Sequence, residues 1–254
     1  MGNSVERTLQ FLMLLAGNDA PSTVSEIAGR LDTSVASASR MAQTLIDAGA
    51  IQRNEQNGRL EIAVDLVQIG AAALRPLEFR RVILPSIAAA LPELQRPVNL
   101  AVPSTKNGIW LESISGNSAV ISSTLMGVRI PYHASTMGKA ILAYLPNERI
   151  QEIVNGNLHR YTNRTIVDPE QLTAELIEIH TRGIALNRGE FREGGLAVAA
   201  PLLNGAGFPV AAFSVPASEE ELDSESPLVR SLTVLGESIS HLLGYSGDDH
   251  HSFV

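Results

Sequence analysis

Residues 5–62 combine three short amphipathic segments with a hairpin signal, and this pattern constrains the fold more than any other part of the chain. Apolar residues at helical spacing, with stop signals between them, predict helices over 5–16, 24–31 and 34–49. Thr23 and Glu26 have the spacing of a capping box, so we expect the second helix to begin directly after Thr23. Ser34 is the expected N-cap of the third helix.

A predicted β-hairpin follows the third helix. Strands over 50–53 and 59–62 flank a turn that ends in Asn57-Gly58, two residues that tolerate positive φ. Two helices joined by a four-residue turn and followed by a hairpin form a winged helix-turn-helix. We therefore expect residues 1–63 to fold into such a domain.

A further helix is predicted over 64–74, and Pro76 interrupts it. Its stripe of Leu66, Ile69 and Ala73 would face water in a monomer, and a helix this short needs a packing partner. The stripe therefore predicts self-association. The expected boundaries are 1–63 for the winged domain, 64–76 for a linker helix, 77–246 for a second domain and 247–254 for a flexible tail.

The rest of the chain mixes helices and strands. Helices are expected over 79–94, 135–145, 147–154, 169–182 and 227–243. Strands are expected over 98–102, 109–113, 120–125, 184–187, 197–202 and 210–215. Antiparallel strands with flanking helices indicate an α+β domain of the kind that senses small molecules.

The outward face of the third helix favours DNA reading. The N-terminal part of this helix enters the major groove in a helix-turn-helix, where Arg pairs with guanine, Gln with adenine and Ser with bases or phosphates. The candidate DNA-binding residues are Ser34, Ser37, Ser39, Arg40 and Gln43 on the helix, with Arg53 and Arg59 on the wing. The alternative is a polar face of a protein-interaction or dimerisation module.

Charge and cysteine content limit the functions open to this chain. The net charge of −8 argues against a general polyanion binder, although a small local DNA-reading surface is compatible with it. The first 76 residues hold six arginines against eight acidic residues, so neither domain is basic. The chain has no cysteine, which excludes disulfides, thiol catalysis and Cys-ligated metal. No apolar run reaches membrane-spanning length and no signal peptide is expected, which fits a cytoplasmic protein.

Linked motifs in both domains carry a family resemblance. In the first domain they are Ser4-Val5-Glu6-Arg7-Thr8-Leu9, Ser25-Glu26-Ile27-Ala28, Ser39-Arg40 and Gly58-Arg59-Leu60. In the second they are PYHASTMGKA at 131–140, YTNRTI at 161–166, Glu193-Gly194 before VAAP at 198–201, and VAAFSV at 210–215. Together, over about residues 4–244, they resemble the isocitrate-lyase-regulator (IclR) family of bacterial transcription factors.

The resemblance implies an α+β fold, with a winged helix-turn-helix joined by a linker helix to a GAF-like α/β effector-binding domain. It implies a homodimer, or a tetramer made of two dimers, that binds a double-stranded, palindromic DNA operator. Effectors in the family are mostly small organic or aromatic acids, no cofactor is expected, and both repressors and activators occur.

The resemblance also places an effector pocket in the second domain. The expected pocket residues are Ser135, Thr136, Met137, Asn187, Ala197 and Ser214. Thr136 and Met137 begin a helix where the family often has small residues whose amides meet a carboxylate. Asn187 stands at an acidic position of the family, and Ala197 at one that often holds Cys or Ser. These departures indicate a pocket that is more apolar than a glyoxylate site, or differently shaped.

An enzyme and a protein-interaction adaptor are the alternative functions. His133 lies near Ser135, but adjacency does not make a triad and no Gly-x-Ser-x-Gly motif is present, so His133 is expected to be structural or to line the pocket. Gly138-Lys139 does not complete a phosphate-binding loop, and Lys139 is expected to be exposed. Tyr132 is expected to help close the pocket over the ligand or to be a rim or interface aromatic, and Trp110 to lie in the pocket wall or the core. The His and Asp residues at 248–251 favour a solvated tail over a metal site.

Overall fold

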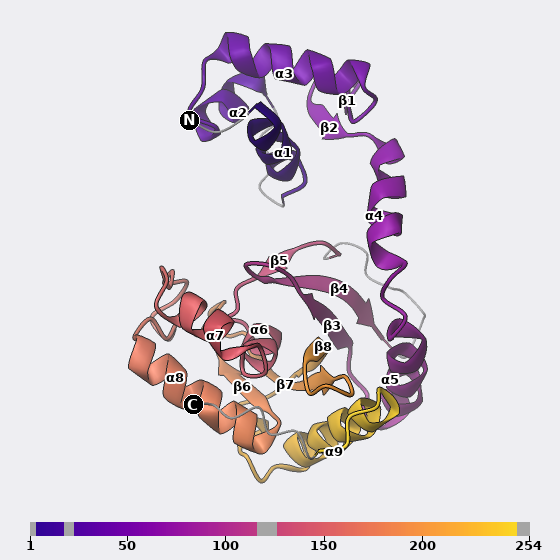
Figure 1. Cartoon of the computed structure of the whole chain (residues 1–254), viewed down its shortest axis with the longest axis vertical. Helices are drawn as coiled ribbons and strands as arrows, with labels where there is room; N and C mark the ends of the chain where they lie inside the picture. The colour runs from indigo at the N-terminus through magenta and orange to yellow at the C-terminus, as the bar shows by residue number, and fades with distance from the viewer. Residues whose placement is uncertain (1–3, 18–22, 116–125, 248–254) are drawn as a thin grey trace. The chain divides into compact units, whose positions relative to one another are not determined.

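The computed structural model describes residues 4–17, 23–115 and 126–247. The chain forms two compact units, Met1–Leu77 and Glu78–Val254. Figure 1 shows both units with the labels used below. Each unit has its own hydrophobic core, so we describe each by itself.

The first unit is a cluster of three helices with a two-stranded wing. Its elements are α1 (Ser4–Leu15), α2 (Val24–Arg30), α3 (Val35–Asp47), β1 (Ile51–Arg53), β2 (Leu60–Ile62), the 3-10 turn η1 (Val64–Leu66) and α4 (Val67–Leu74). Phe11, Ile27 and Leu45 bring the inner faces of the three helices together in the core. The predicted capping box forms, because Thr23 Oγ1 accepts from the Glu26 N–H at 3.2 Å and Glu26 Oε2 accepts from the Thr23 N–H at 3.0 Å.

The wing loop is organised by Asn54 as well as by the predicted turn residues. Gly58 has a φ of +68°, as the turn signal predicts, while Asn57 does not take positive φ. The Asn54 N–H donates to the Arg59 carbonyl at 2.8 Å, and Asn54 Oδ1 accepts from the backbone of the loop. The side chain of Asn54 therefore holds a loop longer than a two-residue turn.

Leu66 belongs to the first unit's core, which corrects the predicted stripe on the linker. The segment begins as the 3-10 turn η1 and becomes α-helical only at Val67. Leu66 is half-buried against the winged-helix core, whereas Val67 and Ile69 are 65% and 68% exposed. The exposed apolar face of α4 therefore includes Val67 and Ile69 and does not include Leu66.

The second unit is built on a six-stranded antiparallel sheet. Its helices are α5 (Arg80–Leu94), α6 (Thr136–Leu142), α7 (Asn147–Val154), α8 (Pro169–Arg182), the 3-10 turn η3 (Glu220–Leu222) and α9 (Pro227–Leu242). Its strands are β3 (Val98–Pro103), β4 (Gly108–Ile114), β5 (Arg129–Ile130), β6 (Ala185–Arg188), β7 (Leu196–Leu203) and β8 (Pro209–Pro216). The strand order is β5-β4-β3-β8-β7-β6.

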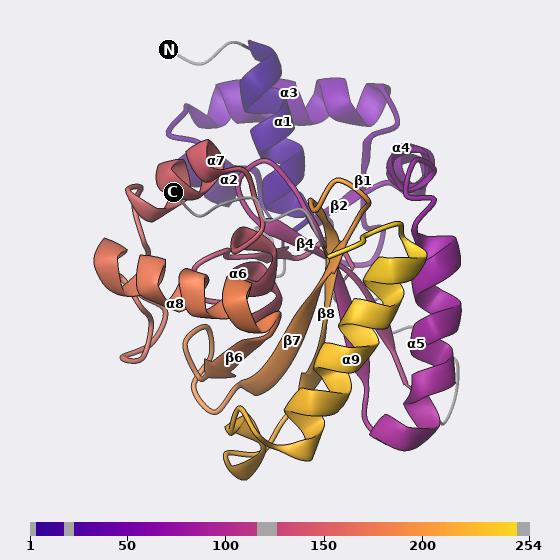
Figure 2. The same cartoon turned by 60° about the horizontal axis from the view of Figure 1, so that its bottom comes forward.

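Helices cover both faces of this sheet. Helix α9 packs on β7 and on α5, while α6 packs on β7, β8 and α8 (Figure 2). Neighbouring residues of β7 point to opposite faces, so Ala199 joins the core under α6 and Ala200 meets Gly236 of α9. This alternation places one row of strand residues, including Ala197 and Ser214, on the α6 side.

Helix α6 lies at the centre of the second unit, and all seven of its residues are buried. It is shorter than the predicted 135–145 segment, because the chain leaves the helix after Leu142. Gly138 is required there, since a Cβ atom would lie 2.3 Å from the Pro131 carbonyl oxygen and 2.4 Å from Ser135 Oγ. This close approach sets the position of the helix start relative to the preceding loop.

The α+β fold class and its winged helix-turn-helix are confirmed. The predicted strand over 120–125 lies outside the described residues. Strand β5 was not predicted, since two residues are too few to show an alternating pattern.

Candidate nucleic-acid interface and ligand cavity

Helix α3 presents its predicted DNA-reading face to solvent. Ala38, Ala42 and Leu45 are buried against the first unit's core, so the opposite face points outward. Ser34 is the N-cap as predicted, and its Oγ accepts from the Ser37 N–H at 3.2 Å. Exposed side chains on the helix include Ser39, Arg40 and Gln43, whereas Ser37 is half-buried.

Two of the candidate side chains are already positioned by neighbours on the same helix. Arg40 Nη2 donates to Ser37 Oγ at 3.3 Å, and Gln43 Nε2 donates to Asp47 Oδ1 at 2.8 Å. The first contact leaves most of the guanidinium donors available for a base edge. The second means that Gln43 must exchange its bond to Asp47 before it can read a base.

The structure adds two residues that the sequence reasoning missed. Val35 begins α3 at helical spacing from the buried Ala38 and Ala42, yet it is 53% exposed, so its methyl groups are open to solvent at the end of the helix that enters a major groove. Arg7 shares a hollow of about 430 Å³ with Arg40 and with hydroxyl side chains of α1 and α3. Two guanidinium groups beside hydroxyls suit a phosphate. No local sequence pattern indicates this site, because it depends on how α1 packs on α3.

The wing places its two arginines on the exposed surface. Arg53 Nη1 donates to the Gly58 carbonyl at 3.3 Å, which ties this side chain to the loop. Arg59 is exposed, and its N–H donates to Asn57 Oδ1 at 2.9 Å while its guanidinium makes no bond with the described residues. Arg59 is therefore the wing side chain with more freedom to reach a phosphate.

The second unit contains a cavity of about 440 Å³ that brings all six predicted effector residues together. From α6 and its cap come Ser135, Thr136 and Met137, and from the strands come Asn187, Ala197 and Ser214. The remaining wall is formed by Asn99, Trp110, Ile130, Phe191, Arg192, Gly194, Gly195, Leu196, Pro216 and Ala217. This volume lies in the range of small-molecule sites, so Met137 does not fill the space.

The polar groups of the cavity are unequally available. Ser135 Oγ donates to the Pro131 carbonyl at 2.7 Å and accepts from the Gly138 N–H at 3.1 Å, so this hydroxyl is already used. The hydroxyls of Thr136 and Ser214 make no hydrogen bond with the described residues. A ligand can therefore exchange hydrogen bonds with Thr136 and Ser214 at little cost.

Asn187 organises the loop beside the cavity. Its Nδ2 donates to the Ala134 carbonyl at 2.7 Å, and its Oδ1 accepts from the N–H groups of Gly189 and Glu190, each at 3.0 Å. The first bond connects the end of β6 to the segment before α6, and the other two hold the loop that follows β6. One N–H of the side-chain amide is left for a ligand.

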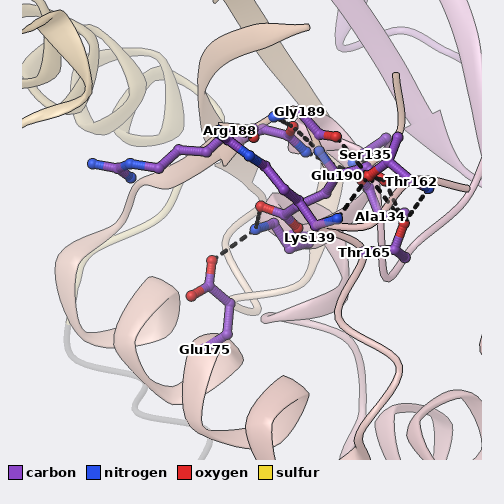
Figure 3. Close-up of polar contacts among 12 residues, drawn as sticks. Ala134, Ser135, Lys139, Thr162, Thr165, Glu175, Arg188, Gly189 and Glu190 are labelled. Carbon is purple, nitrogen blue, oxygen red and sulfur yellow. Dashed lines mark hydrogen bonds and ion pairs between the residues drawn. The ribbon is translucent and has the colours of Figure 1, made fainter. Parts of the chain in front are cut away.

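Lys139 is buried, and the prediction of an exposed helix residue is wrong. Helix α6 is covered by the sheet on one side and by α8 on the other, so Lys139 has no face open to water. Its Nζ donates to Glu175 at 2.7 Å and to Glu190 at 2.8 Å (Figure 3). Two carboxylates satisfy the ammonium group, as a buried charge requires.

The charged form of the Glu190 carboxyl is disfavoured by burial. Burial raises its pKa, and the nearby Lys139 ammonium opposes that rise without cancelling it. Its Oε2 is buried without a hydrogen-bond partner among the described residues. Glu190 therefore depends on Lys139 for its charge.

Tyr132 and His133 are structural. Tyr132 is 1% exposed, and its hydroxyl donates to the Ser104 carbonyl at 2.7 Å, so the prediction of a pocket or rim aromatic is wrong. His133 is buried, and its Nε2 lies 2.9 Å from the His159 carbonyl oxygen, so this nitrogen carries the proton. Burial lowers the pKa of His133. Neither residue lines the cavity, whereas Trp110 does.

In the described part of the chain, no group of three or more His, Asp or Glu residues is placed to hold a metal ion. No helix among those residues is long and apolar enough to cross a membrane. The His and Asp residues at 248–251 lie outside the described ranges.

A winged helix-turn-helix with an exposed reading helix, followed by an α/β unit with a ligand-sized cavity, defines the class of ligand-responsive transcriptional regulators. Two family models match the chain in that order: the IclR helix-turn-helix domain over residues 4–55 and the bacterial transcriptional regulator IclR C-terminal domain over residues 71–241. The chain belongs to the IclR family.

Relatives extend over nearly the whole chain. It is 26% identical to the HTH-type transcriptional regulator XynR of Escherichia coli, over 95% of this chain and 97% of that protein. It is 29% identical to the HTH-type transcriptional repressor AllR of Salmonella typhimurium, over 95% and 90%. Among solved structures, an IclR homologue from Microbacterium hydrocarbonoxydans complexed with 4-hydroxybenzoate has a TM-score of 0.70 at 23% identity, covering 94% of this chain and all of that one.

Proposed function

We propose that this protein is a cytoplasmic transcriptional repressor that binds a palindromic operator as a dimer and senses a small aromatic acid. The observation that carries the proposal is the cavity of about 440 Å³ that gathers all six predicted effector residues, in a chain whose first unit exposes a reading helix. A catalytic role finds no support in the cavity, because none of the described residues that line it is a His, Asp, Glu or Lys that could act as a base.

DNA reading is assigned to α3 and the wing. Arg40 and Gln43 supply base contacts, with Ser34, Ser37 and Ser39 near the groove edge, while Arg53 and Arg59 reach phosphates or the minor groove. Arg7, which faces Arg40 across the hollow, adds a phosphate contact. The net charge of −8 makes non-specific binding weak, so the specific contacts must account for most of the affinity.

Dimer formation is assigned to the exposed apolar face of the linker. Helix α4 spans eight residues, none of them buried, and so short a helix is marginal without a partner. Leu9 and Met13 of α1 add exposed apolar surface, at 54% and 57%. A second copy is the proposed occupant, since two identical reading helices match a palindromic operator.

The effector is assigned to the class of acids with an apolar body. Met137, Ala197 and Trp110 supply apolar wall, while Thr136 and Ser214 supply free hydroxyls. The 4-hydroxybenzoate bound by the Microbacterium homologue guides the choice of probe.

The test is a fluorescence-anisotropy titration of the full-length protein against its gene's own upstream DNA. We expect a dissociation constant of about 10⁻⁸ M or tighter at physiological salt, and binding at least about 10³-fold weaker to scrambled DNA. Equal affinity for both DNAs would contradict the assignment. A thermal-shift screen of small carboxylic acids identifies the effector. At 100 times its dissociation constant, the effector should raise the free energy of unfolding by about 2.7 kcal/mol.

A further inference from the structure

The effector cavity has one charged residue among the described residues that line it. Every other lining residue in that set is apolar, a glycine, or a neutral Ser, Thr or Asn. The exception is Arg192, at the rim. An acid that entered this cavity without meeting Arg192 would therefore place its carboxylate against neutral groups only, which is unfavourable for a desolvated charge.

Arg192 is also unpartnered. Its guanidinium is exposed and forms no ion pair or hydrogen bond with any residue that the structure describes. Two arginines of the same unit are occupied by contrast: Arg96 pairs with Glu221, and Arg164 donates to the Arg188 carbonyl. A free guanidinium presents its planar set of donors to a carboxylate in the bidentate geometry that Arg favours.

The turn that carries Arg192 is held in place from its backbone. The Arg192 carbonyl accepts from the Gly195 N–H at 2.9 Å, and the Gly189 N–H donates to the Gly195 carbonyl at 3.1 Å. Gly194 has a φ of +71°, and a Cβ atom on Gly195 would lie 3.0 Å from the Arg192 carbonyl oxygen. The turn therefore requires glycine at these two positions. Its backbone conformation sets the position of the Arg192 Cα atom, from which the side chain extends.

The base of this turn is anchored by buried groups. Glu190 is paired with Lys139 of α6 at 2.8 Å, and its carbonyl accepts from Thr165 Oγ1 at 2.6 Å (Figure 3). The same α6 begins at Thr136, in the cavity wall. Rim and wall are thus joined by the buried ion pair, so Arg192 is presented from a rigid support.

A second unsatisfied donor lies in the cavity wall. The indole Nε1 of Trp110 is buried and has no acceptor among the described residues. An unpaired buried donor is uncommon in folded proteins. A ligand with an oxygen on its apolar body would supply the missing acceptor.

We infer that Arg192 is the residue that recognises the carboxylate of the effector at the cavity rim, with the body of the acid directed toward Met137 and Trp110. This inference rests on the proposed effector function of the cavity. It names the ligand class more narrowly: an aromatic monocarboxylate that carries a second oxygen, such as a hydroxybenzoate. Recognition by a rim arginine differs from recognition by the first amides of α6, which has only seven residues.

The experiment is calorimetry on the full-length protein with 4-hydroxybenzoate, the benzoate and phenylacetate anions, and the uncharged 4-hydroxybenzamide. Wild type is compared with Arg192→Gln, Arg192→Lys and the control Arg230→Gln. Arg230 is an exposed arginine of α9, 3.7 Å from Glu225 and outside the cavity. Circular dichroism and the melting temperature confirm that each variant is folded.

We expect Arg192→Gln to weaken binding of the acids by about 10- to 100-fold and to leave the amide unchanged, with Arg192→Lys between the two. Arg230→Gln should bind like wild type. If wild type and Arg192→Gln bind the acids equally, the inference is wrong and the effector cavity stands. If Arg192→Gln weakens the acids and the amide alike, Arg192 packs against the ligand body and charge recognition is wrong. If no acid binds wild type, both the inference and the proposed aromatic-acid effector are wrong.

Discussion

At the scale of single residues, we expect sequence reading to depend most on Arg40. It is exposed on α3 and retains free donors beyond its bond to Ser37. We expect Arg40→Ala to cost about 1–3 kcal/mol of operator binding and to relax the preference at one base position. Anisotropy titrations against operators substituted at each position measure both effects. Unchanged affinity together with unchanged preference would mean that α3 is not placed in the groove as proposed.

Arg59 should behave differently, because a phosphate contact carries no sequence information. Arg59→Ala is expected to weaken binding to all DNA sequences by a similar factor and to reduce the slope of log affinity against log salt by about one. Titrations at four salt concentrations give the slope. A loss confined to one operator sequence would instead assign Arg59 to a base.

Substitution of Lys139 measures how much the buried ion-pair cluster behind the cavity rim contributes to stability. Lys139→Met leaves Glu190 buried without its cation, so we expect a loss of about 3–5 kcal/mol in the free energy of unfolding. Adding Glu190→Gln removes the orphaned charge and should recover a large part of that loss. Urea unfolding curves of the single and double variants provide the comparison. A loss below about 1 kcal/mol for Lys139→Met would show that the cluster matters little to stability.

The role of a residue could be predicted where its contacts are with neighbours in the sequence. It could not be predicted where the contacts are with residues far away along the chain. Thr23, Glu26 and Ser34 cap helices through neighbours three residues away, so their roles follow from spacing alone. Lys139 meets Glu175 and Glu190 from other parts of the chain. Nothing near Lys139 in the sequence distinguishes it from an exposed lysine. Arg192 was missed for the same reason, since only the closed turn places it at the cavity.

At the scale of elements, the linker helix makes the clearest prediction. Ile69→Glu introduces a charge on the exposed apolar face of α4, and we expect it to weaken dimerisation by at least about tenfold. The neighbouring exposed Gln68→Glu adds the same charge beside that face and is the matched control. Sedimentation equilibrium of both variants over a range of concentrations is the measurement. An Ile69→Glu protein as dimeric as Gln68→Glu would remove α4 from the interface.

Element boundaries show where periodicity is informative. Long helices such as α8 and α9 agree with their predicted ranges within a residue, because a wide apolar stripe and a cap define each one. The linker segment deviates, since the 3-10 turn at its start changes the pitch and moves Leu66 into the core. Helix α6 is too uniformly buried to show a stripe, which explains its overestimated length.

At the scale of the whole molecule, we propose that acid binding in the second unit alters DNA binding by the first. The sequence predicted the fold of both units, and the family resemblance named six of the residues that line the cavity, but the coupling between the units cannot be read from local patterns. Coupling between two sites is reciprocal, so it can be measured from either side.

The most direct test is therefore to measure operator affinity at zero and saturating acid, and acid affinity with and without operator, on the full-length protein at one salt concentration. The acid is the one that gives the largest shift in the thermal screen. We expect the acid to weaken operator binding by about 5- to 150-fold, and the operator to weaken acid binding by the same factor. Unchanged operator affinity at saturating acid would contradict the proposed coupling between acid binding and DNA binding.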